Sequence, residues 1–222
     1  MHLEGLLTGG PGLGTFLLLM GLGLLPFVFM VTTSYAKMVV VISLLRNALG
    51  TGGVPSGLLV SALALSLSLF VMMPVGEAMW SRAAPILAQA GDRPDAKHAP
   101  LYLDAAIEAS IPLREFLRRH AHEEELALFE ELARRAGGEA SRDDLRVLVP
   151  AFLLSELAEA FQMGFLLFLP FLVVDVIVAN VLLALGMHML NPVTVSLPFK
   201  LLLFVAADGL TLLAKALVLG YA

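Results

Sequence analysis

The sequence predicts an all-α polytopic membrane protein with about four long apolar helices, arranged as two hairpins and interrupted by prolines. Three observations support this prediction. Hydrophobic residues make up 59% of the 222 residues and the mean hydropathy is +0.88, whereas globular proteins contain roughly 45–50% apolar residues. Four apolar stretches approach the about 20 residues that a helix needs to cross the hydrocarbon core. Charge is concentrated elsewhere, because 23 of the 33 charged residues lie between Arg82 and Arg146.

This uneven charge divides the chain into three expected domains. Residues 1–81 are expected to form an N-terminal membrane hairpin, residues 82–146 a small inserted polar helical domain, and residues 147–222 a C-terminal membrane hairpin. Helices are favoured over strands because the chain lacks the ten-residue alternating segments of a membrane barrel. No Lys or Arg precedes Lys37, so we expect a retained first membrane segment and no cleaved signal peptide.

The N-terminal hairpin is predicted from two apolar stretches, at residues 13–45 and 58–75. Turn-forming residues from Gly50 to Pro55 separate the two. Prolines lie within or at the ends of the apolar stretches, where they are expected to kink or end helices; they are Pro26, Pro74 and Pro170.

The polar middle part is predicted to hold two amphipathic helices between residues 101 and 136. In the second, Leu126, Phe129, Leu132 and Ala133 recur at the three- and four-residue spacing of one helix face. Glycines at 137 and 138 are expected to stop it. Ser141, with Asp144 three residues later, resembles the start of the next helix.

The C-terminal hairpin is predicted from stretches at residues 148–185 and 195–219. Pro170, with Gly164 nearby, is expected to bend or break the first of these. Asn191-Pro192 marks the turn between them, because the residue before a proline avoids the helical region. Lys37, Arg46 and Lys200 accompany the two short turns, so both turns are expected in the cytoplasm, and the termini and the polar domain in the periplasm.

Ionisable residues inside apolar stretches are the first candidate site residues, because each costs roughly 2.5–3.5 kcal/mol at a lipid-facing helix centre. Lys37 and Lys215 are expected to extend to the membrane interface. Deeper acidic residues are expected to lie in a polar path or to pair between subunits, and Asp175 and Asp208 are both candidate partners of Lys200. The predicted buried charges for subunit packing are Glu156, Asp175, Lys200 and Asp208.

The run Met187-His188-Met189 is the second candidate site. Methionine is unbranched and deformable, so such residues from several subunits could close around a moving polypeptide. The alternative interpretation is an ordinary lipid-facing or core loop. His120 and His122 beside Glu123-Glu124-Glu125 fit no standard zinc spacing, and a solvated helix face is favoured there. No metal, no cofactor and no catalytic residue is predicted.

Several sequence blocks together resemble the FliP/SctR (YscR) family over well over half of the chain. The most specific is Asn191-Pro-Val-Thr-Val-Ser-Leu-Pro-Phe-Lys200, in which Pro198, Phe199 and Lys200 form the family motif, with Asp175 upstream. Further matching blocks lie at residues 32–50, 73–75, 149–161, 170–175, 184–187 and 204–209. The residues of the polar middle part carry little of this resemblance.

The resemblance implies a core component of the type III secretion export apparatus, with the absence of a signal peptide favouring the injectisome branch. In that family several copies, typically five, assemble with two smaller membrane proteins into a gate that passes unfolded proteins across the inner membrane. The family's methionine-rich loop acts as a gasket, and Met187, His188 and Met189 fall on it. His188 stands where many relatives have a third methionine, and Leu210 where a tryptophan is common.

Two function classes remain open on the sequence. The first is a non-enzymatic pore subunit of the export gate. The second is a secondary transporter for ions or small solutes, which buried Asp and Lys residues and proline-broken helices would also fit. A transporter is expected to show internal repeats, but the first pair of apolar stretches does not resemble the second. An intramembrane enzyme is disfavoured because no catalytic constellation is visible.

Overall fold

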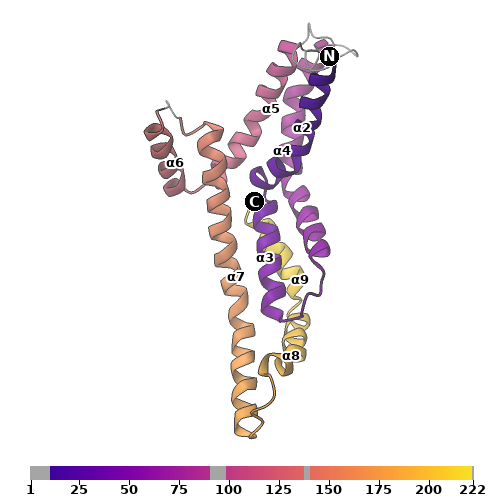
Figure 1. The fold of residues 1–222 in the computed structure, drawn as a ribbon, viewed down its shortest axis with the longest axis vertical. Coiled ribbons are helices and arrows are strands. Elements are labelled where there is room, and N and C mark those ends of the chain that lie inside the picture. Colours follow the sequence, from indigo (N-terminus) through magenta and orange to yellow (C-terminus); the bar gives the residue numbers. More distant parts are fainter. Residues whose placement is uncertain (1–10, 91–98, 138–140, 222) are drawn as a thin grey trace, which may run out of the picture.

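The computed structural model describes residues 11–90, 99–137 and 141–221, and these ranges contain helices and no strands. Figure 1 shows an elongated molecule in which α7 forms the long axis of one half. The helices are α2 (Pro11–Thr32), α3 (Tyr35–Leu49), α4 (Gly57–Ala90), α5 (Ala99–His120), α6 (Glu123–Arg135), α7 (Leu145–Ala184), α8 (Pro192–Ala206) and α9 (Gly209–Leu219). The predicted all-α class is confirmed.

Two helices, α4 and α7, are long and apolar enough to cross a membrane, and the number rises to four if each of two bent helix pairs is one span. One bent pair is α2 with α3, at 69°, and the other is α8 with α9, at 61°. The predicted count of about four is therefore reached with two unbroken helices and two broken pairs, each pair counted as one span. The breaks occur in the first and fourth apolar stretches, whereas the sequence led us to expect a break in the third.

The break between α2 and α3 is lined by hydroxyl groups. Ser34 Oγ donates to Ser68 Oγ of α4 at 3.1 Å, and the hydroxyls of Thr32 and Thr33 donate to the carbonyls four residues earlier at 2.7 Å. These side chains are buried. Buried polar groups require partners, so the short hydroxyl side chains satisfy one another where the helix direction changes.

Pro170 does not break α7, which contradicts the expected break. The helix continues from Leu145 to Ala184 through Pro150 and Pro170. Pro26 and Pro74 likewise lie inside α2 and α4. α3 packs closely along α7 on this stretch: a Cβ added at Gly164 would lie 3.1 Å from Leu44 Cβ and 3.2 Å from Leu44 Cγ. A larger residue at this position would require Leu44 to shift.

Both amphipathic helices predicted in the polar part are present as α5 and α6. Gly137, at φ 86°, follows the end of α6, as the glycine pair predicted. The start of α7 is capped by Asp144, whose side chain accepts from the backbone N–H of Arg146 at 3.0 Å, and Ser141 lies outside the helix. Both expected domain boundaries fall near or inside helices, because α4 continues to residue 90 and α7 begins at 145.

Two apolar cores hold the described helices together. The first is formed mainly by α3 with residues of α4, α7 and α9. The second joins α5, α6 and the first turns of α7 around Leu117, Leu126 and Phe152. Large apolar side chains remain exposed along α2, α4, α7 and α8. Exposed apolar surface on this scale belongs against lipid or other protein.

Candidate functional site

The Met187–Met189 loop joins α7 to α8 at one end of the molecule, far from α5 and α6 (Figure 1). Gly186, at φ 75°, ends α7, and the N–H groups of Gly186 and Met187 donate to the carbonyls of Leu183 and Leu182 at 3.0 and 2.9 Å. This pair of bonds is a Schellman motif. Asn191 then starts α8 by accepting from the N–H of Val193 at 3.0 Å. Both ends of the loop are therefore fixed by hydrogen bonds, between backbone groups at the end of α7 and through the Asn191 side chain at the start of α8.

The three predicted gasket side chains are exposed. Met189 is 98% exposed and Met187 43% exposed, and His188 is exposed as well. The structure thus holds two thioethers and an imidazole on a short loop with a defined backbone. In a single chain nothing among the described residues covers Met189, so this loop can contact other copies or a passing chain.

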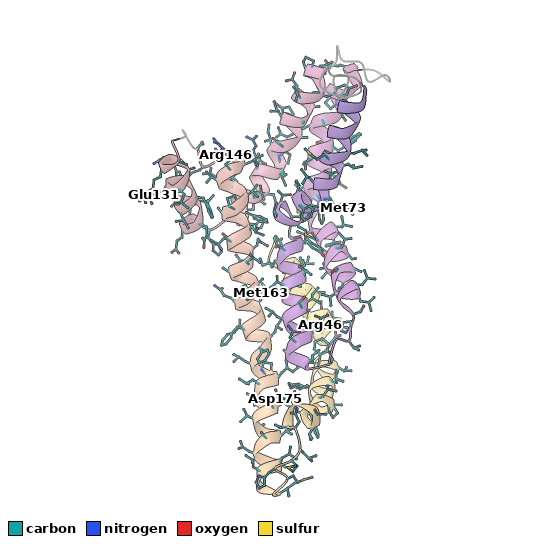
Figure 2. All side chains as sticks on the ribbon, viewed as in Figure 1. Arg46, Met73, Glu131, Arg146, Met163 and Asp175 are labelled. Atoms are coloured by element: carbon teal, nitrogen blue, oxygen red, sulfur yellow. The ribbon has the colours of Figure 1, made fainter. Side chains whose placement is uncertain are left out.

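Lys200 and Asp175 form an ion pair between α8 and α7, with Nζ and Oδ2 2.7 Å apart. Figure 2 shows Asp175 on the part of α7 that lies beside α8. Ser196 Oγ donates to the other carboxylate oxygen, and Lys200 Nζ donates to the carbonyl of Ala48 at 3.1 Å. The sequence left open whether Asp175 or Asp208 pairs with Lys200, and the structure pairs it with Asp175.

The family motif splits between two faces of α8. Lys200 is buried, whereas Pro198 and Phe199 are exposed, Phe199 by 55%. Successive helix residues point about 100° apart, so the three cannot share one contact. Lys200 acts inside the chain, and Phe199 is available to a neighbour or to lipid.

A second buried ion cluster lies where α3 and α7 meet. Lys37 Nζ lies 2.5 Å from Glu159 Oε2 and 3.4 Å from Glu156 Oε1. The side chains of Lys37 and Glu156 are each 1% exposed. The expectation that Lys37 extends to the membrane interface is therefore wrong, because its ammonium is paired inside the protein. Lys215 is exposed, as expected for a lysine at an interface.

Two histidines border this cluster from the polar part of the chain. His122 Nε2 lies 2.8 Å from Glu159 Oε1, and its backbone N–H donates to Ser155 Oγ at 2.8 Å. Burial lowers the pKa of His120, and the nearby charges of Lys37 and Arg119 lower it further. His122 is thus part of an ion network, while its side chain stays exposed together with those of Glu123 and Glu124, in agreement with the predicted solvated helix face.

Asp208 is exposed and stands at the corner between α8 and α9. Its backbone is left-handed, at φ 50° and ψ 44°, and its carboxylate accepts from Thr211 Oγ1 at 2.9 Å. Of the four predicted packing charges, Glu156 and Lys200 are buried, Asp175 is partly buried and Asp208 is not buried within one chain. A role for them in subunit packing stays a prediction.

Sequence reasoning missed two partners in these clusters. Ser196 faces Asp175, and Tyr221 donates from its hydroxyl to Glu156. A polar residue four positions before Lys200 on the same helix face was a usable signal for Ser196. Tyr221 lies beyond the last apolar stretch, and only the tertiary fold brings it to α7.

The sequence is similar to a known protein family and to several named bacterial proteins. The model described as the FliP family matches residues 18–217. The chain is 46% identical over 218 residues to "Pathogenicity-related ORF2" of Xanthomonas campestris pv. glycines, covering 95% of this chain and 98% of that protein. It is 47% identical over 206 residues to "Hypersensitivity response secretion protein HrcR" of Ralstonia nicotianae, covering 90% and 93%. It is 41% identical over 205 residues to "Yop proteins translocation protein R" of Yersinia pestis, covering 90% and 92%.

Proposed function

The chain belongs to the FliP family, and on this basis we propose that it is a pore-forming core subunit of a type III secretion export gate, passing unfolded proteins across the bacterial inner membrane. The observation that carries the proposal is the extent of the match, which leaves few residues outside the family model. The names of the relatives refer to secretion, translocation and pathogenicity. They favour the injectisome branch over the flagellar branch.

The chain acts in this proposal as a structural part of the pore and not as an enzyme. Several copies, typically five, assemble with two smaller export-gate membrane proteins. The exposed apolar faces of α2, α4, α7 and α8 supply the surfaces for these neighbours and for lipid. The ion pairs formed within each chain support this arrangement. A buried charge that already has a partner leaves no unpaired charge when a neighbouring apolar surface covers it.

The Met187–Met189 loop is the gasket in this proposal. Its fixed ends hold the loop in place, while the methionine side chains stay free to adapt to different contacts. Copies around an axis would present these side chains toward one another. The alternative of an ordinary lipid-facing loop predicts that the methionines can be replaced by alanine without effect on permeability.

A secondary transporter is the competing function, and the buried Asp175–Lys200 pair is the feature that favours it. Purification in mild detergent followed by mass measurement separates the two. A large complex containing several copies and two smaller membrane proteins supports the gate. A monomer or homodimer with substrate-dependent flux supports the transporter and overturns the gate.

The proposed location is the inner membrane, with the gasket loop toward the cytoplasm and the polar part toward the periplasm. The chain has no cysteine, so single introduced cysteines report accessibility without background. Glu131→Cys on α6 is expected to react with an impermeant thiol reagent in the periplasm. Met189→Cys is expected to react only after the cytoplasmic side is opened, and the reverse pattern would invert the proposed orientation.

A further inference from the structure

Tyr221 lies two residues beyond the end of α9, and its ring packs against the end of α5. The ring stacks on Phe116 with centroids 6.0 Å apart and planes at 17°. It also meets the ring of His120 at 5.0 Å and 60°. Phe116 in turn contacts Phe152 of α7 at 5.6 Å. A short aromatic chain therefore connects the end of α9 to α5 and α7.

The polar atoms of Tyr221 and its neighbours form a second set of contacts. The hydroxyl donates to Glu156 Oε2, and Lys37 Nζ lies 4.5 Å from the ring centroid, within the range of a cation–π contact. The group contains two carboxylates, Glu156 and Glu159, and a single lysine. The tyrosine hydroxyl supplies the donor that the second oxygen of Glu156 needs in a buried site.

Tyr221 also lies between the two apolar cores. Among the described residues, Tyr221 and Val71 are the partly buried side chains that pack against both cores. Val71 does so from the middle of α4, where the helix itself fixes it. Tyr221 does so from beyond the end of a helix, where its side-chain contacts and one bond from its N–H to the carbonyl of Val218, at 3.1 Å, hold it.

We propose that Tyr221 is a clasp that locks α9 and the core around α3 to the second core, where α5 and α6 pack on the first turns of α7. When the clasp is closed, α9 and this second core move as one body. When the tyrosine leaves Glu156 and Phe116, α9 can change its angle to the second core. All the contacts lie within one chain, so the clasp does not depend on the proposed pore function.

The contacts explain why a tyrosine is needed at this position. Phenylalanine would keep the stack on Phe116 but would leave Glu156 Oε2 without a donor, and an unsatisfied buried charge is destabilising. Alanine would remove both the stack and the donor. The two substitutions therefore separate the aromatic half of the clasp from its polar half.

The test measures the distance between α9 and the second core. Spin labels are attached to Leu128→Cys on α6 and Leu219→Cys on α9, two exposed positions in a chain without native cysteine. The distance between the two spin labels is measured by double electron–electron resonance on the full chain in detergent. Tyr221→Ala is compared with Tyr102→Ala, which removes a tyrosine of α5 whose hydroxyl donates to no carboxylate among the described residues.

The clasp predicts a narrow distance distribution for the unmodified chain and for Tyr102→Ala. It predicts a broader and shifted distribution for Tyr221→Ala, with Tyr221→Phe in between. A Tyr221→Ala distribution as narrow as that of Tyr102→Ala would overturn the clasp. If Tyr221→Ala does not purify, Tyr221→Phe decides: broadening that Glu156→Gln restores supports the clasp, and an unchanged width overturns it. Since no secretion is measured, the result is independent of the export gate.

Discussion

Lys200 Nζ lies 2.7 Å from Asp175 Oδ2 and 3.1 Å from the carbonyl oxygen of Ala48, so one ammonium group joins α8, α7 and the end of α3. The side chain of Lys200 is 3% exposed and that of Asp175 is 21% exposed. Lys200 is therefore more deeply buried than Asp175. Asp175 also keeps a hydroxyl donor from Ser196, whereas without Asp175 the lysine would retain only a backbone carbonyl.

We predict that Asp175→Leu destabilises the protein more than Lys200→Met. The first leaves a buried unpaired ammonium, and removing one partner of a buried pair costs about 3–5 kcal/mol. The second leaves a partly exposed carboxylate with a remaining donor, for which about 1–3 kcal/mol is expected. The midpoint of thermal unfolding in detergent measures both.

The double variant is expected to lose less than the sum of the two, because an apolar pair of similar volume can replace a buried ion pair. Lys215→Met on the exposed face of α9 is the control and should leave the midpoint unchanged. Additive losses in the double variant would show that the pair does not act as a unit.

The gasket makes a prediction about leakage. Replacing Met187 and Met189 together by alanine is expected to leave assembly intact and to make cells expressing the complex permeable to small solutes, because the shortened side chains no longer close the pore. Uptake of a small membrane-impermeant dye measures the leak, and the size of the purified complex measures assembly.

Leu185→Ala is the matched control for the gasket, since Leu185 is 67% exposed on the same loop but lies outside the Met-His-Met run. It should not leak. Equal dye uptake in the double-alanine variant and in the unmodified strain would count against a sealing role for the methionines.

Close packing of α3 on α7 predicts opposite effects at two glycines. Gly164→Ala places a Cβ 3.1 Å from Leu44 Cβ, so that Leu44 must shift, and overpacking of this kind costs about 1–3 kcal/mol. Gly76→Ala in α4 meets nothing within 4 Å, so it should be neutral or stabilise by up to about 1 kcal/mol through helix propensity. Thermal midpoints in detergent compare them, and a Gly164→Ala protein as stable as Gly76→Ala would contradict the packing.

The lowered pKa of His120 leads us to predict how the free energy of unfolding changes with pH. Burial, together with repulsion from Lys37 and Arg119, lowers its pKa below the ordinary value of 6.5. The unfolded chain therefore binds a proton more readily than the folded one, and stability decreases as the pH falls below about 6.5. His120→Phe should reduce the loss of thermal midpoint between about pH 7.5 and about pH 5.5. His188→Phe, in the exposed loop, is the control and should leave that loss unchanged.

The helices were largely predictable because apolar length and periodicity are local properties. The two amphipathic helices at α5 and α6 follow from residue spacing, and the turn at Asn191 follows from the proline after it, because the residue before a proline avoids the helical region. The continuity of α7 through Pro170 was not predictable, because a proline by itself favours a kink or a helix end. The bend at Ser34 was not predictable either, because it involves a contact with Ser68 of α4.

The candidate site was predictable in its residues but not in its pairing. Charges inside apolar stretches marked Glu156, Asp175 and Lys200, because burying them without partners is unfavourable. Which partners meet is a property of the fold. Lys37, expected at the membrane interface, is instead paired with two glutamates, and Tyr221 reaches one of them from beyond α9.

Asp208 yields the last prediction, which separates charge from backbone conformation. Its left-handed backbone is unfavourable for most residues by roughly 1–2 kcal/mol but is tolerated by aspartate and asparagine. If aspartate is needed at position 208 because it tolerates the left-handed backbone of the corner between α8 and α9, Asp208→Asn should fold and secrete normally. Asp208→Leu should then lower the midpoint of thermal unfolding. If the exposed carboxylate instead binds a neighbouring copy, Asp208→Asn should fold normally but fail to secrete. Thermal unfolding and a secretion assay on the two variants therefore distinguish a conformational role from the predicted role in subunit packing.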